Sequence, residues 1–254
     1  MEKITLVLDT VGLASQIILE NGGETYRAEE TVERMCKGLG VPKVDVLALP
    51  TGLMLTLTDD EGNNITRIVR VHSRSIHLKN IDLCNGISRQ VAAGKMTAEE
   101  AMKALQEVKR ERNERKWLLI GASALSAGGF AVMLGGAWIE FFVALFCGTA
   151  VEAIMLLMAK RSVPGMVSGL IAGALTTLAA LAGSVIFPGL NIEPIISGSI
   201  MPLLPGLATT NGIRDTIRGD LVSGGARIIE AVLCAIMLAA GIGLVLSMWR
   251  GVVG

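Results

Sequence analysis

A run of arginines and aspartates follows two prolines in an apolar segment. Pro202 and Pro205 interrupt the segment, and four charged residues follow it, namely Arg214, Asp215, Arg218 and Asp220. Proline removes a backbone donor and blocks regular helix, so in lipid the freed carbonyl groups need partners from protein or from cavity water. Broken helices of this kind line substrate sites in transporters. Guanidinium groups beside such a break could bind the carboxylate of a small solute.

Hydroxyl, amide and charged side chains around this break are therefore the predicted substrate-binding residues. Arg227 and Glu230, three residues apart at the start of a later apolar run, could face the same place. The alternative is a tight loop whose charges pair with one another and hold the topology, and it stays open for Arg218 and Asp220. The predicted substrate-binding residues are Thr209, Thr210, Asn211, Arg214, Asp215 and Arg227.

A second polar cluster, GGETYRAEE, covers Gly22–Glu30. Glu24, Arg27 and Glu30 lie three residues apart and so share one helix face, where they could pair with one another or bind a zwitterionic or anionic solute. The simpler interpretation is a helix start, because acidic residues are favoured near the positive end of a helix. The residues alone leave both interpretations open.

Glu152 is a carboxylate inside an apolar run, three or four residues from the centre of that run. A carboxylate facing lipid at that depth costs at least about 2.5 kcal/mol, so we expect it to face a bundle interior or a wet cavity. Glu152 and Glu230 are the predicted proton-coupling residues. A structural acid bonded to a neighbouring Ser or Thr is the alternative for Glu152.

The elements that must position these residues are apolar helices. Residues 117–254 hold six basic and six acidic residues, too few to solvate an ordinary globular surface. Five runs there are long enough to cross a bilayer at about 1.5 Å rise per residue. Glycines such as Gly173 and Gly241 suit close helix packing in lipid. The predicted spans cover about 117–137, 138–159, 163–187, 192–211 and 227–249.

The basic residues at the ends of the runs predict the orientation. Arg112, Arg115 and Lys116 precede the first run, and Lys160 and Arg161 follow the second. Because Lys and Arg collect on the cytoplasmic side, this pattern places the amino terminus in the cytoplasm and the carboxyl terminus outside. We therefore expect a multi-pass membrane protein with this orientation.

Residues 1–116 read as a small cytoplasmic α+β domain. Val7, Val11, Ala14 and Ile18 recur at helical spacing, and a second amphipathic helix follows the Gly22 turn. Short strands come next, of which 53–58 and 65–72 should form a hairpin around a Gly-containing turn. Helices over roughly 78–93 and 97–114 close the domain, the latter with a Thr97 and Glu100 capping box.

Several classes of function are disfavoured by the sequence. Its 23 basic and 23 acidic residues balance, so no nucleic-acid partner is expected. The Ser, phosphate-loop and zinc-protease motifs of common enzymes are missing, and none of the four cysteines forms a C-x-x-C pair. The two histidines, His72 and His77, are five residues apart and would fall on opposite faces if the chain there is a strand, which disfavours joint metal binding. No cofactor, metal or catalytic residue is therefore predicted.

Two stretches resemble a known family, the threonine/serine exporter (ThrE-like) family. They are GGETYRAEETVERMCKGLG and PLLPGLATTNGIRDTIRGDLVSGGARIIEA. Long members of that family carry a soluble domain, about five spans and a second bundle, so this chain is similar to the larger, amino-terminal-type subunit of its two-component form. The resemblance implies a heteromeric or homomeric assembly in the bacterial inner membrane, associated with succinate export and with a smaller membrane partner of four or five spans. Matching motif residues are Glu24, Arg27, Glu29, Pro205, Gly206, Asn211, Arg214, Asp215, Asp220, Arg227 and Glu230.

The predicted function is a proton-coupled exporter of small carboxylates such as threonine, serine or succinate, acting as an antiporter. One alternative is a membrane-anchored hydrolase with its site at Glu24, Arg27, Glu29 and His72. Another is a passive subunit whose soluble domain binds the solute and gates a pore made by the partner. An anchor alone needs neither five glycine-rich spans nor a double-proline break, which favours transport.

Overall fold

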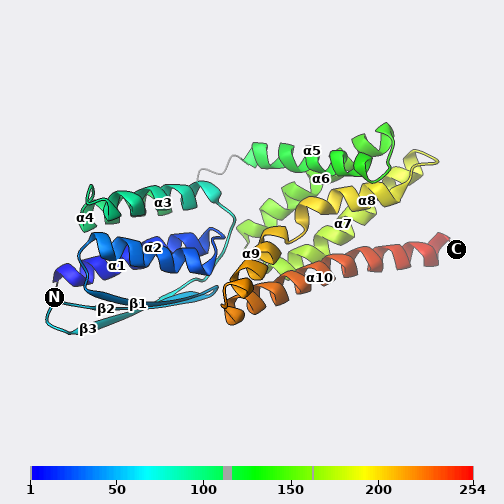
Figure 1. Ribbon diagram of the computed structural model, residues 1–254. Helices are drawn as coiled ribbons and strands as arrows, with labels where there is room; N and C mark the ends of the chain where they lie inside the picture. Colours follow the sequence, from blue (N-terminus) through cyan, green and yellow to red (C-terminus); the bar gives the residue numbers. More distant parts are fainter. Residues whose placement is uncertain (1, 111–115, 162, 254) are drawn as a thin grey trace. The chain divides into compact units, whose positions relative to one another are not determined.

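The computed structural model describes residues 2–110, 116–161 and 163–253 (Figure 1). The chain is mostly helical and forms two compact units. Unit 1 is discontinuous, because it combines Met1–Asn113 with the later segment Leu207–Ile228. Unit 2 combines Glu114–Gly206 with Ile229–Gly254.

Unit 1 has three layers: a sheet, the helix pair α1 and α2, and the helix pair α3 and α4 (Figure 1). Its core lies on the face of α1 that the spacing predicted, since Val7, Val11, Ala14 and Ile18 are all buried. The helices are α1 (Glu2–Glu20), α2 (Thr25–Gly38), α3 (Leu78–Ala92) and α4 (Ala98–Arg110). The predicted capping box is confirmed, because the Glu100 amide donates to Thr97 Oγ1 and the Thr97 amide to Glu100 Oε2. Residues 111–114 of the helix predicted over 97–114 lie outside the described residues.

The sheet is antiparallel with strand order β1 (Lys43–Leu49), β2 (Gly52–Thr58) and β3 (Asn64–Arg70). The predicted hairpin is confirmed, with Leu57 opposite Ile65 and a turn in which Gly62 has a φ of +85°. Alternate residues of β2, including Leu55 and Leu57, are buried against the helices, as the period of a half-buried strand requires.

Two cysteines lie in the core of unit 1. Cys36 on α2 and Cys84 on α3 are fully buried. Burial raises the pKa of each thiol to about 12, because desolvation disfavours the thiolate. Both thiols are therefore protonated and shielded while unit 1 is folded, and their reaction with a thiol reagent reports its unfolding.

Unit 2 contains the apolar helices α5 (Lys116–Met133), α6 (Trp138–Lys160), α7 (Gly165–Ile186) and α8 (Ile192–Ile200). A 3-10 turn, η1 (Met201–Leu203), follows, and α10 (Leu221–Val253) contributes its part from Ile229 onward. By length and composition, α5, α6, α7 and α10 can each cross a membrane. A fifth crossing results if the bent pair around the prolines is counted as one span.

Glycines bring the helices of unit 2 into backbone contact. A Cβ atom on Gly173 of α7 would lie 2.2 Å from the carbonyl oxygen of Leu238 on α10. Likewise, a Cβ atom on Gly241 of α10 would lie 2.1 Å from the carbonyl oxygen of Leu170 on α7. Any larger side chain would force these helices apart, so the glycines serve the close packing that the sequence predicted.

The two prolines divide the fourth predicted span. Helix α8 and η1 precede the break, and α9 (Gly206–Ile217) follows it after Pro205. The helix axis bends by 53° there. The break at Pro202 and Pro205 is therefore present, and α9 beyond it belongs to unit 1 from Leu207 onward.

Candidate functional site

A tight glycine turn joins α1 to α2. Gly22 has a φ of +86°, a conformation that side-chain-bearing residues rarely adopt. At Gly23 an added Cβ atom would lie 2.4 Å from Cγ2 of Ile18, so no side chain fits there either. Gly22 and Gly23 follow the end of α1 at Glu20, so their carbonyl groups accept no hydrogen bond of that helix and need other partners.

Side chains from the late segment of unit 1 supply those partners. Asn211 Nδ2 on α9 donates to the Gly22 carbonyl at 2.9 Å. Arg227 Nη2 on α10 donates to the Gly23 carbonyl at 2.8 Å. Both side chains are buried. Residues separated by about 190 positions in the sequence therefore meet at one backbone turn.

Glu24 lies between two arginines. It is the N-cap residue of α2, and its Oε2 atom is 2.8 Å from Nε of Arg27. Its Oε1 atom accepts a hydrogen bond from Nη1 of Arg214 on α9. Glu24 is 9% exposed, whereas the side chains of Arg27 and Arg214 are 43% and 46% exposed. One nearly buried carboxylate thus holds two arginines that solvent can reach.

Asp215 and Arg227 form a second, fully enclosed ion pair. Nε of Arg227 lies 3.2 Å from Oδ2 of Asp215, and the two side chains are 5% and 0% exposed. Removing one partner of such a buried pair is costly, because the remaining single charge carries a desolvation penalty of several kcal/mol. This pair joins α9 to α10 beside the glycine turn.

Asp220 and Arg218 attach the connection between α9 and α10 to the start of α2. Oδ2 of Asp220 accepts a hydrogen bond from Thr25 Oγ1 at 2.9 Å, and Oδ1 accepts one from the Ser223 amide in the first turn of α10. The guanidinium carbon of Arg218 lies 3.6 Å from the centre of the Tyr26 ring, within cation–π range. Both ends of this short connection therefore contact α2.

The close packing of α9 on α10 depends on two glycines. A Cβ atom on Gly224 would lie 2.1 Å from Thr216 Oγ1 and 2.7 Å from the Gly212 carbonyl oxygen. A Cβ atom on Gly212 would lie 2.9 Å from the side chain of Ile228. The two helices are thereby held close enough for Asp215 and Arg227 to pair.

Glu29 connects α2 to the sheet. Its Oε1 atom accepts a hydrogen bond from the Ala48 amide of β1 at 2.8 Å. Burial raises the pKa of the Glu29 carboxyl above its ordinary value of 4.5, and the charges of Asp220, Glu33 and Asp215 act in the same direction. The Ala48 hydrogen bond opposes this shift.

Replacing Glu29 by glutamine is expected to stabilise unit 1 at pH 7. Because folding raises this pKa, the stability that the neutral carboxyl confers is present below pH 4.5 and is lost as the pH rises through the folded value. Glutamine stays neutral and can still accept from Ala48. Unfolding followed by labelling of Cys36 should show a difference between variant and parent at pH 7 that disappears below pH 4.5. A variant that is less stable at pH 7 would contradict this assignment.

We call the charged residues described above, together with Asn211, the polar cluster. Its formal charges balance, four against four. The carboxylates are Glu24, Glu29, Asp215 and Asp220, the guanidinium groups are Arg27, Arg214, Arg218 and Arg227, and Asn211 completes the set. All of them belong to unit 1.

The structure places the other predicted site residues elsewhere. Thr209 and Thr210 are exposed on α9, before the charged turn of that helix. Glu152 is half-buried on α6 and Glu230 half-buried on α10, and both belong to unit 2, as do Pro205 and Gly206. In the described part of the chain, no group of three or more His, Cys, Asp or Glu residues is arranged to hold a metal ion.

Sequence reasoning missed the partners of the polar cluster. The pairing expected on the face of Glu24, Arg27 and Glu30 is found between Glu24 and Arg27, whereas Glu30 pairs with Arg34 at the i,i+4 position. The acceptors in the Gly22–Gly23 turn are backbone atoms, which no side-chain pattern reveals. The repeated glycine in GGET was the one available signal of a special turn.

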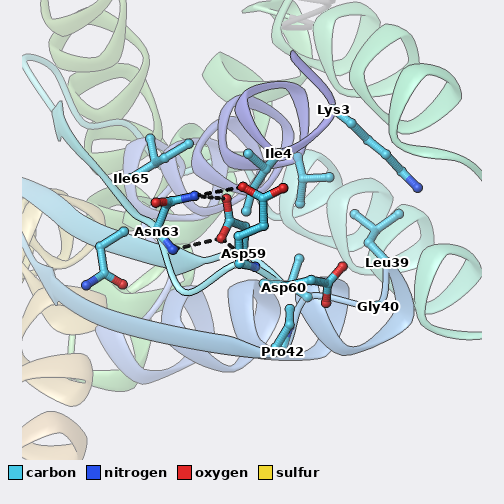
Figure 2. Close-up of a pocket in the computed structure, with 13 residues that line it drawn as sticks. Lys3, Ile4, Leu39, Gly40, Pro42, Asp59, Asp60, Asn63 and Ile65 are labelled. Atoms are coloured by element: carbon cyan, nitrogen blue, oxygen red, sulfur yellow. Dashed lines mark hydrogen bonds between the residues drawn. The ribbon is translucent and has the colours of Figure 1, made fainter. Parts of the chain in front are cut away.

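A separate pocket of about 600 Å³ lies where α1 begins and α2 ends (Figure 2). The polar cluster lies at the opposite end, where α1 ends and α2 begins. The length of α1, which rises about 1.5 Å per residue, separates the two sites. Figure 2 shows Asp59 bonded to Asn63 within the turn between β2 and β3. The pocket is therefore distinct from the polar cluster, and its acidic turn is occupied by its own hydrogen bonds.

Helices able to cross a membrane by length and composition, together with a segment bent at two prolines, are features of a membrane transport protein. The sequence model of the ThrE family, described as "Putative threonine/serine exporter", matches residues 9–249. The chain therefore belongs to the threonine/serine exporter family, and it is a membrane exporter by that membership.

Individual relatives agree with this assignment. The chain is 25% identical over 235 residues to "Probable succinate transporter subunit YjjP" of Escherichia coli, covering 91% of this chain and 90% of that protein. A protein of the same name from Klebsiella aerogenes is 24% identical, with the same coverage. The "Threonine/serine exporter" of Corynebacterium glutamicum is 32% identical over 162 residues, which cover 61% of this chain but 33% of that protein. No solved structure matches the chain.

Proposed function

We propose that the chain is the larger subunit of an inner-membrane exporter that moves small carboxylate-bearing metabolites outward. The observation that carries this proposal is the gathering of both motifs at one place, where Arg27 and Arg214 share the Glu24 carboxylate and stay half-exposed. Arginine binds carboxylates through two parallel hydrogen bonds, which gives both affinity and orientation. Threonine, serine and a dicarboxylate such as succinate all carry the group that this pair would bind.

Residues of the polar cluster divide into two roles in this proposal. Arg214 contacts the solute, and the exposed hydroxyl groups of Thr209 and Thr210 lie one turn earlier on α9. Asn211, Asp215 and Arg227 are buried and hold α9, α10 and the glycine turn together. These six residues form the proposed substrate site, with Glu29 and Asp220 as its supports.

The proposed topology places domain 1–116 in the cytoplasm and the spans 117–254 in the membrane, with the carboxyl terminus outside. The basic residues that flank the spans support this orientation, and the charge distribution across the chain supports the division. We propose a second, smaller membrane subunit of four or five spans as the partner. The word subunit in the names of the two YjjP relatives supports that assembly.

Proton coupling is proposed at Glu152, with Glu230 as the second candidate. Glu152 is half-buried on the apolar helix α6, where an acidic residue is usually tied to transport. Replacing Glu152 by glutamine should keep the shape of the side chain but abolish export that depends on a proton gradient, while exchange of substrate without a gradient continues. Gradient-driven export at the parent rate would contradict the assignment and point to Glu230.

Export by this chain with and without the smaller subunit tests the proposed function. Cells that lack their own exporters are loaded with succinate or with a threonine dipeptide, and the appearance of the metabolite outside is measured. We expect export from cells that contain both subunits and little from cells that contain either one. If neither metabolite leaves the cells, the carboxylate exporter is wrong. Hydrolysis of small esters by the membranes would then favour the anchored hydrolase.

A further inference from the structure

The arginines of the polar cluster differ sharply in their access to solvent. Arg227 is enclosed, with 5% of its side chain exposed, and its charge is paired with Asp215. Arg27 and Arg214 are almost half-exposed. A solute can therefore reach Arg27 and Arg214 without any rearrangement of the buried pair.

Glu24 occupies both accessible arginines at once. One oxygen faces Nε of Arg27 and the other accepts from Arg214, so each oxygen serves a different guanidinium group. A carboxylate placed between two guanidinium groups is the arrangement that a bound substrate carboxylate would also adopt. Glu24 thus supplies the same chemical group, a carboxylate, that the proposed substrate carries.

We propose that Arg27 and Arg214 together form the carboxylate-binding pair, and that Glu24 is an internal competitor which the substrate carboxylate displaces. The inference rests on the proposed export of carboxylates and deepens it in two ways. It assigns Arg27 a direct part in binding, and it makes Glu24 a residue that weakens affinity. An exporter gains from such a competitor, because substrate must leave the site as readily as it enters.

Displacement of Glu24 is feasible because its neighbours do not depend on it. The Gly22 and Gly23 carbonyls stay bonded to Asn211 and Arg227, and the buried pair of Asp215 with Arg227 stays intact. The side chains of Arg27 and Arg214 are 43% and 46% exposed, so water and a competing carboxylate can both reach their guanidinium groups. A competing carboxylate can therefore exchange with Glu24 at modest cost.

The test measures uptake of radiolabelled succinate, and in a parallel arm threonine, into inside-out membrane vesicles that contain this chain and its smaller subunit. Glu24→Gln keeps the side chain's size and removes its charge. We expect the KM for the transported substrate to fall about fivefold, because the competitor is lost. An unchanged or higher KM would overturn the inference. The substrate with the lower KM, succinate or threonine, is the carboxylate compound that the site binds better.

Two further variants separate competition from a general change in structure. Asp45→Asn removes a carboxylate of unit 1 that pairs with Lys43 on β1, and its KM should match the parent. Adding Arg27→Gln to Glu24→Gln should raise the KM again, because one half of the binding pair is gone. If Glu24→Gln does not fold, Glu24→Asp serves instead. Its side chain is one methylene shorter, so it cannot span both arginines, and its KM should also fall.

Failure of this inference is distinguishable from failure of the proposed function. If parent vesicles transport a carboxylate and Glu24→Gln leaves its KM unchanged or raised, the competitor role is wrong and the exporter stands. If neither parent nor variant vesicles accumulate succinate or threonine, the proposed function is wrong and the inference falls with it.

Discussion

Replacing Arg227 by alanine is expected to lower the free energy of unfolding of unit 1 by about 3–5 kcal/mol. The change leaves the carboxylate of Asp215, which has no exposed side-chain surface, without its charged partner at 3.2 Å. It also removes the donor to the Gly23 carbonyl. Both groups are buried where water cannot replace the lost contacts, so the penalty of breaking the pair is not recovered.

Thiol labelling in urea measures this loss, because Cys36 and Cys84 are accessible only when unit 1 unfolds. The matched control replaces both partners, with Arg227→Met and Asp215→Leu in one chain. Apolar side chains of similar size often restore or exceed the stability of a buried ion pair. The double variant should therefore unfold at a clearly higher urea concentration than the single variant. A single variant as stable as the parent would show that the pair is hydrated.

Arg214→Gln is expected to lower kcat/KM for carboxylate export about tenfold to a hundredfold. A hydrogen bond to a charged group contributes about 1.5–3 kcal/mol, and glutamine cannot supply the charge. Stability should change little, because the Arg214 side chain is 46% exposed. Initial rates of uptake into inside-out vesicles over a range of substrate concentrations give the ratio directly.

Arg34→Gln is the matched control for this variant. Arg34 pairs with Glu30 at the i,i+4 position on α2. Its removal should leave transport at the parent level. Export by Arg214→Gln at the parent rate, with Arg27 unchanged, would remove Arg214 from the proposed site. Arg214→Lys should be intermediate, since lysine keeps the charge but cannot form two parallel hydrogen bonds.

Local patterns in the sequence were sufficient for much of the fold. The spacing of Val7, Val11, Ala14 and Ile18 predicted the buried face of α1, because helical periodicity records which side meets the core. Alternation in β2 and the Gly62 turn predicted the hairpin for the same reason. Prolines at 202 and 205 predicted the helix break, since proline cannot donate the backbone hydrogen bond.

The assembly of the candidate site could not be read from such patterns. Periodicity relates residues a few positions apart, whereas Glu24 and Arg214 are separated by 190 positions. Asn211 and Arg227 bind backbone carbonyls, and any residue type supplies the same carbonyl group. Both motifs were recognised as polar, but their direct contact required the three-dimensional structure. The division of the arginines into accessible and enclosed ones likewise depends on tertiary packing.

The discontinuity of unit 1 has a consequence for biosynthesis. Translation runs from the amino terminus, so Met1–Asn113 leave the ribosome well before Leu207–Ile228 exist. Until then the glycine turn lacks Asn211 and Arg227, and Glu24 lacks Arg214. Maturation of this unit is therefore a late event that follows production of the hydrophobic helices. Nascent chains arrested before residue 207 would expose the Gly22 and Gly23 carbonyl groups without these donors and would leave Glu24 with Arg27 as its one arginine partner of the two.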